Sequence, residues 1–180
     1  MGTSVTIETA AEQDGEQILK LQYLCFQSDA ERYGDYRLEP LTQTLDGVRA
    51  EIADGHVLVA RLGDEIVGSV RAVVDADGTA AIGKLIVHPR MQRHGLGRRL
   101  LTAIEARLAE RVPVTRYRLS TGHRGEAGLR LYRKVGYTPV ATERVSRALS
   151  VITLEKSVPT SSTEGGTTAP ADRGPLAATA

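Results

Sequence analysis

IGKLIVHPRMQRHGLGRRLLTAIEARL, residues 82–108, is the stretch that decides how the chain folds. It begins with a short apolar run, Leu85–Val87, that is typical of a buried strand. His88-Pro89 ends that strand because proline has no N–H to donate to a neighbour. After a turn with two glycines, apolar residues recur at helical spacing: Leu100, Leu101, Ile104 and Leu108. The stretch therefore predicts a strand, a tight loop and a helix in succession.

Positive charge gathers where this helix begins. Arg93, His94, Arg98 and Arg99 lie at the end of the helix where the macrodipole already presents positive partial charge and where acidic residues would stabilise it. These side chains oppose the helix unless an anion lies among them. Solvated arginines on an ordinary connection are the alternative, but the sign of the charge and the preceding strand favour an anion site. Free N–H groups, close-approaching glycines and arginines suit phosphate best.

Two common phosphate motifs are excluded. Gly95–Leu100 lacks the third glycine of the dinucleotide-binding fingerprint. No Gly-Lys-Ser/Thr of a P-loop occurs anywhere in the chain. The phosphate site predicted here is therefore of another kind.

The remaining pattern resembles the pyrophosphate loop of the GNAT superfamily of N-acetyltransferases. The family motif Gln/Arg-x-x-Gly-x-Gly/Ala is met by Gln92–Gly97, and the family's preceding Leu-x-Val-x-Pro is met by Leu85–Pro89. The resemblance implies that the loop amides bind the diphosphate of acetyl-CoA, the co-substrate, and that the strand backbone pairs with the pantetheine arm. The cofactor-binding residues that it implies are Leu85, Ile86, Val87, Gln92, Arg93, His94, Gly95, Leu96, Gly97, Arg98 and Arg99.

Composition indicates one domain followed by a tail. The chain has 180 residues, of which 41% are hydrophobic, enough for one core. The single cysteine, Cys25, excludes a disulfide framework and a cysteine zinc cluster, and the four histidines show no close metal-ligand spacing, so we expect no metal. There is no signal-peptide segment and no long apolar span, so we expect a cytoplasmic protein that does not interact with membranes.

Charge is distributed unevenly along the chain. Residues 1–55 carry eleven acidic and four basic residues, whereas residues 56–156 carry nine acidic and eighteen basic residues. The basic segment suits a polyanionic cofactor and the acidic segment suits a cationic partner, with solvated surface as the alternative for the acidic segment.

The periodicity of apolar residues and the positions of turn residues predict an α/β (α+β) domain over residues 1–156. Residues 157–180 are Thr/Ala/Gly/Pro-rich and are predicted to be a disordered C-terminal tail. Ser28–Pro40 is predicted to be a loop. Asp14 is predicted to cap a helix that ends near Gln27 and turns Ile18, Leu21, Leu24 and Cys25 inward. The other predicted helices run from Thr42 or Thr44 to Ala53, after Gly97, and over Glu126–Val135. The predicted strands are Val5–Glu8, His56–Leu62, Ile66–Val74, Thr79–Val87, Thr115–Ser120, Tyr137–Val145 and Ala148–Leu154.

The resulting order, β-α-α-β-β-β-α-β-α-β-β, is the order that the GNAT resemblance implies. It also implies a mixed central sheet in which the strands at Leu85 and Leu119 are parallel but splay apart. Unpaired backbone groups would then face the cofactor.

The resemblance also implies a general acid. Leu131–Tyr137 matches the family motif Leu-Tyr-x-Lys-x-Gly-Phe/Tyr, which places Tyr132 on the tyrosine whose hydroxyl protonates the coenzyme A sulfur. A phenol is uncharged near neutral pH and donates one proton, so it suits that role. By periodicity alone, Tyr132 would be a core aromatic.

The general base stays open. Many family members carry a glutamate on the strand before the loop, but Thr79–Leu85 contains no carboxylate. The candidates are Glu31, Asp35, Glu39, His123 or a chain of water molecules. The following helix departs from the family too, because Gly125 and Gly128 replace its Asn and Ala, so that backbone or Arg124 takes over that cofactor contact.

The GNAT resemblance implies that Ser28–Glu39 forms the wall of the acceptor site. Tyr33 and Tyr36 would stack on the substrate while Glu31 and Asp35, together with Glu39, attract an ammonium group. This composition points to a small cationic amine or a peptide amine.

The function predicted is an acyltransferase for acyl groups other than aminoacyl, namely an acetyl-CoA-dependent N-acetyltransferase. It would act by direct transfer in a ternary complex, because no cysteine falls in the motif region. The alternative is a catalytically idle acyl-CoA sensor or interaction module on the same fold. No nucleic acid is expected as a partner, because aromatic residues are not interleaved with the arginines. A homodimer stays open.

Overall fold

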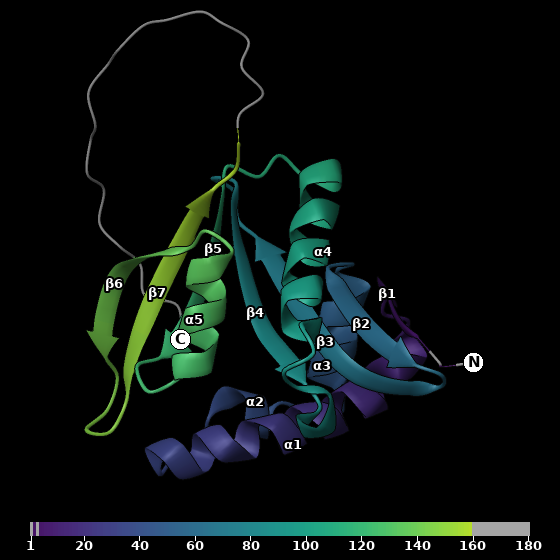
Figure 1. Cartoon of the computed structure of the whole chain (residues 1–180), viewed down its shortest axis with the longest axis horizontal. Helices are drawn as coiled ribbons and strands as arrows, with labels where there is room; N and C mark the ends of the chain where they lie inside the picture. Colours follow the sequence, from purple (N-terminus) through teal and green to yellow (C-terminus); the bar gives the residue numbers. More distant parts are fainter. Residues whose placement is uncertain (1, 3, 160–180) are drawn as a thin grey trace, which may run out of the picture.

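The computed structural model of the chain describes residue 2 and residues 4–159 (Figure 1). Within these residues, the mixed α/β architecture confirms the predicted fold class. The predicted tail begins at Ser157, which is the last residue of a strand, and from residue 160 onward it lies outside the described residues.

A seven-stranded mixed sheet forms the centre of the domain, in the order β1-β2-β3-β4-β5-β7-β6. Neighbouring strands are antiparallel except β4 and β5, which are parallel. The strands are β1 (Val5–Thr9), β2 (Val57–Leu62), β3 (Glu65–Val74), β4 (Thr79–Val87), β5 (Arg116–Gly122), β6 (Thr138–Arg144) and β7 (Ser150–Ser157).

The helices cover both faces of this sheet. They are η1 (Glu12–Asp14), α1 (Gly15–Tyr33), α2 (Glu39–Thr42), α3 (Leu45–Ala53), η2 (Pro89–Met91), α4 (Leu96–Arg111) and α5 (Glu126–Lys134). Figure 1 shows α4 and α5 in front of the sheet, with α3 behind it and α1 crossing beneath the lower end of β4. Among the described residues, no helix is both long enough and apolar enough to span a bilayer.

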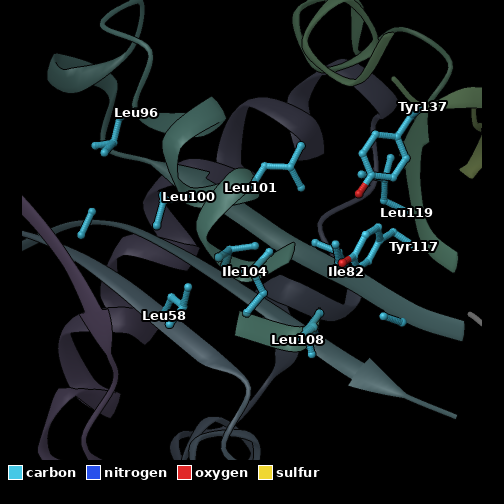
Figure 2. Close-up of a cluster of buried hydrophobic side chains, with 14 of the residues drawn as sticks. Leu58, Ile82, Leu96, Leu100, Leu101, Ile104, Leu108, Tyr117, Leu119 and Tyr137 are labelled. Atoms are coloured by element: carbon cyan, nitrogen blue, oxygen red, sulfur yellow. The ribbon is translucent and has the colours of Figure 1, made fainter. Parts of the chain in front are cut away.

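Two apolar cores result, one on each face. The larger core lies under α4, where Leu100, Leu101, Ile104 and Leu108 have no exposed surface, as their spacing predicted. Figure 2 shows these α4 side chains directed at Leu58, Ile82 and Leu119 of the sheet. The smaller core joins α1 and α3 to the opposite face through Ile18, Leu21, Val48, Ile52, Val57, Val59, Ile66 and Ile86.

A β-bulge in β4 changes which face its residues occupy. Ser69 pairs with Ile86 and Arg71 with Gly83, so two residues of β4 lie opposite one residue of β3. Lys84 within the bulge has a left-handed φ of 47°. Side chains alternate along a strand, and an inserted residue reverses the alternation. Ile82 therefore belongs to the core under α4 and Ile86 to the core under α1.

The parallel strands β4 and β5 separate after a short paired segment, as predicted. Their register is Thr79 with Arg116, Ala80 with Tyr117 and Ala81 with Arg118, and it ends there. From Ile82 onward, the edge of β4 that faces β5 has no strand partner. This separation opens the sheet at the carboxyl ends of the two strands.

The predicted loop Ser28–Pro40 is wrong at both ends. Helix α1 continues through Tyr33 and ends at Gly34, whose left-handed φ of 63° closes it, and Glu39 begins the short α2. The polar composition of residues 28–33 suggested a loop, but no glycine or proline interrupts it, and Ala30 and Tyr33 are buried against the fold. Tertiary burial thus outweighs local polarity.

Two predicted roles in α1 are also wrong. Leu24 is 47% exposed instead of facing inward. Asp14 precedes the helix, but its carboxylate does not cap it; it accepts a hydrogen bond from the Ala11 N–H at 2.7 Å and pairs with Arg61 at 2.7 Å. Burying a charged carboxylate is costly unless it is paired, so Asp14 pairs with Arg61 instead of capping the helix.

Close packing of α4 on β3 predicts a stability loss for Gly68→Ala. A Cβ at Gly68 would lie 2.9 Å from Leu100 Cδ1 and 3.1 Å from the Ile86 carbonyl oxygen. Overpacking of this kind costs about 1–3 kcal/mol. Denaturant unfolding should show that loss for Gly68→Ala. The matched Gly83→Ala, whose Cβ would meet nothing within 4 Å, should change the free energy of unfolding far less. Equal losses would contradict this packing.

Candidate active site

A cleft of 490 Å³ lies between the separated strands β4 and β5. One wall is the free edge of β4 from Ile82 to Val87, and the other contains Leu119, Ser120 and Thr121 of β5. Helix α1 closes one side with Cys25, Phe26, Asp29 and Tyr33, and α5 contributes Tyr132. The cleft therefore brings the predicted strand and the predicted tyrosine together.

The loop before α4 has the geometry of an anion cradle. Arg93 and Gly95 both have left-handed φ angles, 68° and 76°, and Gly95 is the N-cap residue of α4. No side chain caps this helix end and its first turn holds no acidic residue, so backbone N–H groups stay free for a ligand. Leu96 is buried and anchors the turn, whereas Arg93, His94 and Arg98 are exposed.

Other residues of the predicted loop support its shape. Gln92 lines the cleft, and its amide Nε2 donates to the Val87 carbonyl oxygen at 3.0 Å, which ties the loop to the end of β4. A Cβ on Gly97 would reach Leu131 Cδ2 at 3.4 Å, so a small residue there lets α4 and α5 approach. Arg99 donates to the Val5 carbonyl oxygen at 3.1 Å and so points toward β1.

Tyr132 is positioned by small residues and by a second tyrosine. Its ring lies beside Gly128, where a Cβ would be 3.4 Å from Tyr132 Cε2, and it meets the Tyr137 ring edge-on with centroids 6.3 Å apart. Burial, and then the charge of Asp29, raise the pKa of Tyr132 to about 12. The hydroxyl is therefore protonated at neutral pH and can serve as a proton donor.

The chain is similar to known proteins in sequence and in structure. A family model described as the Acetyltransferase (GNAT) family matches residues 15–137. The chain belongs to the GNAT acetyltransferase family. The match includes the cradle, the free edge of β4 and Tyr132. Among curated proteins, none matches this chain.

Solved structures share the GNAT fold at low sequence identity. The yncA protein of Salmonella typhimurium, solved with its cofactor acetyl-CoA, is 20% identical with a TM-score of 0.70, covering 91% of this chain and 99% of that chain. The paia N-acetyltransferase of Thermoplasma acidophilum, in complex with coenzyme A, is 17% identical with a TM-score of 0.69, covering 86% of this chain and 99% of that chain. The ribosomal-protein-S18-alanine N-acetyltransferase of Escherichia coli is 16% identical with a TM-score of 0.71, covering 91% of this chain and 100% of that chain.

The predicted acceptor residues of this GNAT domain line the cleft only in part, through Tyr33 and Glu39. Glu31 and Tyr36 are exposed and do not line it. The Asp35 carboxylate accepts a hydrogen bond from the Arg37 N–H at 2.9 Å and also lies outside the lining. Glu39 does line the cleft, but Lys84 Nζ binds its carboxylate at 3.0 Å. Their role in acceptor binding stays a prediction.

Tyr33 is buried and holds the loop between β5 and α5. Its hydroxyl accepts the Arg124 backbone N–H at 3.0 Å. A Cβ on Gly122 would lie 2.1 Å from that hydroxyl, so only glycine at this position admits the ring. The Arg124 guanidinium donates to the Arg32 carbonyl oxygen at 3.3 Å. In this arrangement Arg124 joins α1 to α5, and its predicted contact with the cofactor stays a prediction.

His123 is a poor candidate for the general base. Its backbone N–H already donates to the Ser150 carbonyl oxygen at 2.8 Å, and the Ser150 N–H lies 3.0 Å from Nδ1. Nδ1 also lies 3.1 Å from the Ser150 carbonyl oxygen, so it contacts Ser150 in either tautomer. His123 does not line the cleft, and its role as a base stays a prediction.

A network of polar side chains lies beside the bulge of β4. Lys84 Nζ contacts Gln43 Oε1 at 2.8 Å and Glu51 Oε1 at 3.3 Å, and Arg71 also pairs with Glu51. Burial alone would raise the pKa of Glu51, but the two cations outweigh it and lower that pKa. This network neutralises the charge of Lys84, which also lines the cleft. Among the described residues, no group of three or more His, Cys, Asp or Glu side chains is arranged to hold a metal ion.

Asp29 is the cleft residue that sequence reasoning missed. Cys25, Asp29 and Tyr33 are spaced four residues apart, so they share one face of α1, and all three line the cleft. The spacing is present in the sequence, but it indicates a shared face only if residues 28–33 are helical, and their polar composition predicts a loop.

Burial of Cys25 predicts that its thiol reacts slowly with alkylating reagents. Burial, opposed by a hydrogen bond to the Val87 carbonyl oxygen and assisted by Asp29, raises the pKa of Cys25 to about 11. Only the thiolate reacts, so at pH 8 iodoacetamide should modify Cys25 roughly 200 times more slowly than a free thiol of pKa about 8.5. The rate should rise about tenfold per pH unit toward pH 11.

The protein unfolded in denaturant provides the control, because the chain has a single cysteine. The unfolded chain should react like a free thiol. A folded protein that reacts equally fast would show that Cys25 is solvated.

Proposed function

We propose that the chain is an acetyl-CoA-dependent N-acetyltransferase that moves an acetyl group to a primary amine by direct transfer in a ternary complex. The observation that carries the proposal is the neutral hydroxyl of Tyr132 in a cleft whose other wall is the unpaired edge of β4. The uncapped, basic N-terminus of α4 lies at the end of that edge. The acceptor is a small cationic amine or a peptide amine.

The residues present fit acetyl-CoA along its length. The loop Gln92–Gly97 and the first turn of α4 offer N–H groups and arginines to the diphosphate. The free edge of β4 over Leu85, Ile86 and Val87 faces the pantetheine amides, because β4 has already separated from β5. The Val87 carbonyl oxygen is excepted, because it already accepts a hydrogen bond from Gln92. The bound co-substrate supplies an acetyl thioester, whose carbonyl carbon is the electrophile.

Direct transfer requires no covalent enzyme intermediate. The amine nitrogen forms a bond to the acetyl carbon, the C–S bond breaks, and the Tyr132 hydroxyl gives its proton to the departing sulfur. Cys25 also lines the cleft, but its raised pKa keeps it a thiol near neutral pH, which supports direct attack by the amine.

Removal of the Tyr132 hydroxyl is the central test. In Tyr132→Phe, kcat should fall by about 10- to 100-fold because the leaving thiolate loses its proton donor, while the acetyl-CoA Kd stays within twofold. Free thiol release from acetyl-CoA, measured with polyamines, amino acids, aminoglycosides and peptide amines, gives kcat, and calorimetry gives Kd. An unchanged kcat would contradict the assignment of Tyr132. Binding of acetyl-CoA by the parent without release of thiol to any amine would instead support the idle sensor.

The anion cradle is tested by a matched pair of glycines. Gly95 and Gly63 both have left-handed φ angles, 76° and 62°, and a Cβ on either would meet nothing within 4 Å. Valine is strained in that conformation, so both substitutions should lower stability. By calorimetry, Gly95→Val should weaken coenzyme A binding at least tenfold, whereas Gly63→Val, in the β2–β3 turn, should leave the Kd within twofold. Equal affinities for the two variants would remove the cradle from the proposal.

A further inference from the structure

One face of α1 supplies the cleft with a carboxylate. Asp29 lies one turn after Cys25 and one turn before Tyr33, and Phe26 beside them also lines the cleft. The Asp29 side chain is 33% exposed, so it is neither fully solvated nor sealed in the core. It faces a space that a substrate can enter.

Asp29 differs from the other carboxylate in the cleft lining. Glu39 is bound by Lys84 at 3.0 Å, and that lysine is 15% exposed and held by Gln43 and Glu51 as well. Among the described residues, Asp29 pairs only with Arg32, at 2.6 Å, three residues along the same helix. An i,i+3 pair on a half-exposed helix contributes little stability, so a substrate ammonium group can replace Arg32 at small cost.

Asp29 and the proposed acid line the same cleft from different elements, Asp29 from α1 and Tyr132 from α5. The negative charge of Asp29 also contributes to the raised pKa values of both Tyr132 and Cys25. The cleft therefore holds both a carboxylate and the hydroxyl that would protonate the leaving sulfur.

We propose that Asp29 is the acceptor-side catalytic carboxylate, which binds the ammonium group of the amine and accepts its proton. This inference rests on the proposed N-acetyltransferase function. It supplies the base that β4 lacks, since Thr79–Leu85 contains no carboxylate.

The proton balance is complete without another reactant. The ammonium group gives one proton to an Asp29 carboxylate oxygen, and the neutral nitrogen attacks the acetyl carbon. As the C–N bond forms and the C–S bond breaks, sulfur takes the Tyr132 proton, and the second nitrogen proton returns to Tyr132 through water. Asp29 then releases its proton to solvent, so one proton is produced per acetyl group transferred.

The surroundings of Asp29 suit this role. Burial raises the pKa of Asp29 above its usual range, and the Arg32 guanidinium opposes that rise. A carboxylate of raised pKa is a stronger base than an ordinary aspartate. The titratable groups that act on the site are Arg32 and Cys25 from α1 and Tyr132 from α5.

The test compares Asp29→Asn, Asp29→Glu and the control Glu16→Gln, which removes an exposed carboxylate from the same helix. Thiol release is measured from pH 6.5 to 9.5 with spermidine, L-lysine, tyramine and an alanine-initiated peptide. At pH 7, kcat/KM of Asp29→Asn should fall about 100-fold for the amine that the parent uses best. The loss should shrink as pH rises, because solvent then supplies the neutral amine. Asp29→Glu should recover at least tenfold over Asp29→Asn, and the acetyl-CoA Kd should stay within twofold.

A loss of threefold or less in Asp29→Asn would overturn the inference, and so would a larger loss that is the same at every pH or that Glu16→Gln reproduces. If the parent transfers acetyl groups and Asp29→Asn has the same kcat/KM, only the assignment of Asp29 is wrong. If the parent does not bind acetyl-CoA, the proposed function itself is wrong.

A second readout needs no acceptor. Asp29→Asn should make Cys25 react faster with iodoacetamide at pH 8, because the thiolate no longer faces a negative charge. An unchanged rate would overturn the placement of the carboxylate in the cleft.

Discussion

The separation of β4 from β5 is the constraint on which the rest of the molecule depends. Two parallel strands that stayed paired would leave no space between them, and their backbone groups would satisfy one another. Here the pairing ends at Ala81 and Arg118, and the bulge at Lys84 follows at once. A bulge bends its strand and increases the local twist. The free edge of β4 and the 490 Å³ cleft are its direct consequences.

The same bulge connects the two faces of the sheet to the site. By reversing the side-chain alternation, it lets Ile86 pack under α1 while Ile82 packs under α4. Helix α1 is thereby held against the end of β4, with Cys25 Sγ 3.4 Å from the Val87 carbonyl oxygen. The helix that forms one wall of the cleft and the loop that forms the cradle both contact Val87 at the end of β4.

Charge is arranged along the cleft in a sequence that matches a thioester transfer. Basic side chains lie at the uncapped start of α4, and Asp29 and Tyr132 line the cleft from α1 and α5. Lys84, which also lines the cleft, is held by Glu39 and Glu51. Strand β4 carries no carboxylate, and the proposed base comes from helix α1 instead.

The amino-acid sequence by itself determined the order of the elements, the pyrophosphate-like loop and the position of Tyr132, because these depend on local periodicity, on proline and glycine, and on a contiguous motif. It did not determine the length of α1, because residues 28–33 are polar and only the burial of Ala30 and Tyr33 against distant segments stabilises the helix there. A loop there predicts Glu31 and Asp35 as the acidic site residues, whereas the helix places Asp29 on the face that lines the cleft. Lys84 shows the same limit, because its left-handed backbone depends on the bulge opposite β3 and its acceptors are Glu39 of α2, Gln43 after α2 and Glu51 of α3. Only the tertiary structure could decide which side chains share the cleft, because that depends on contacts between residues remote in the chain.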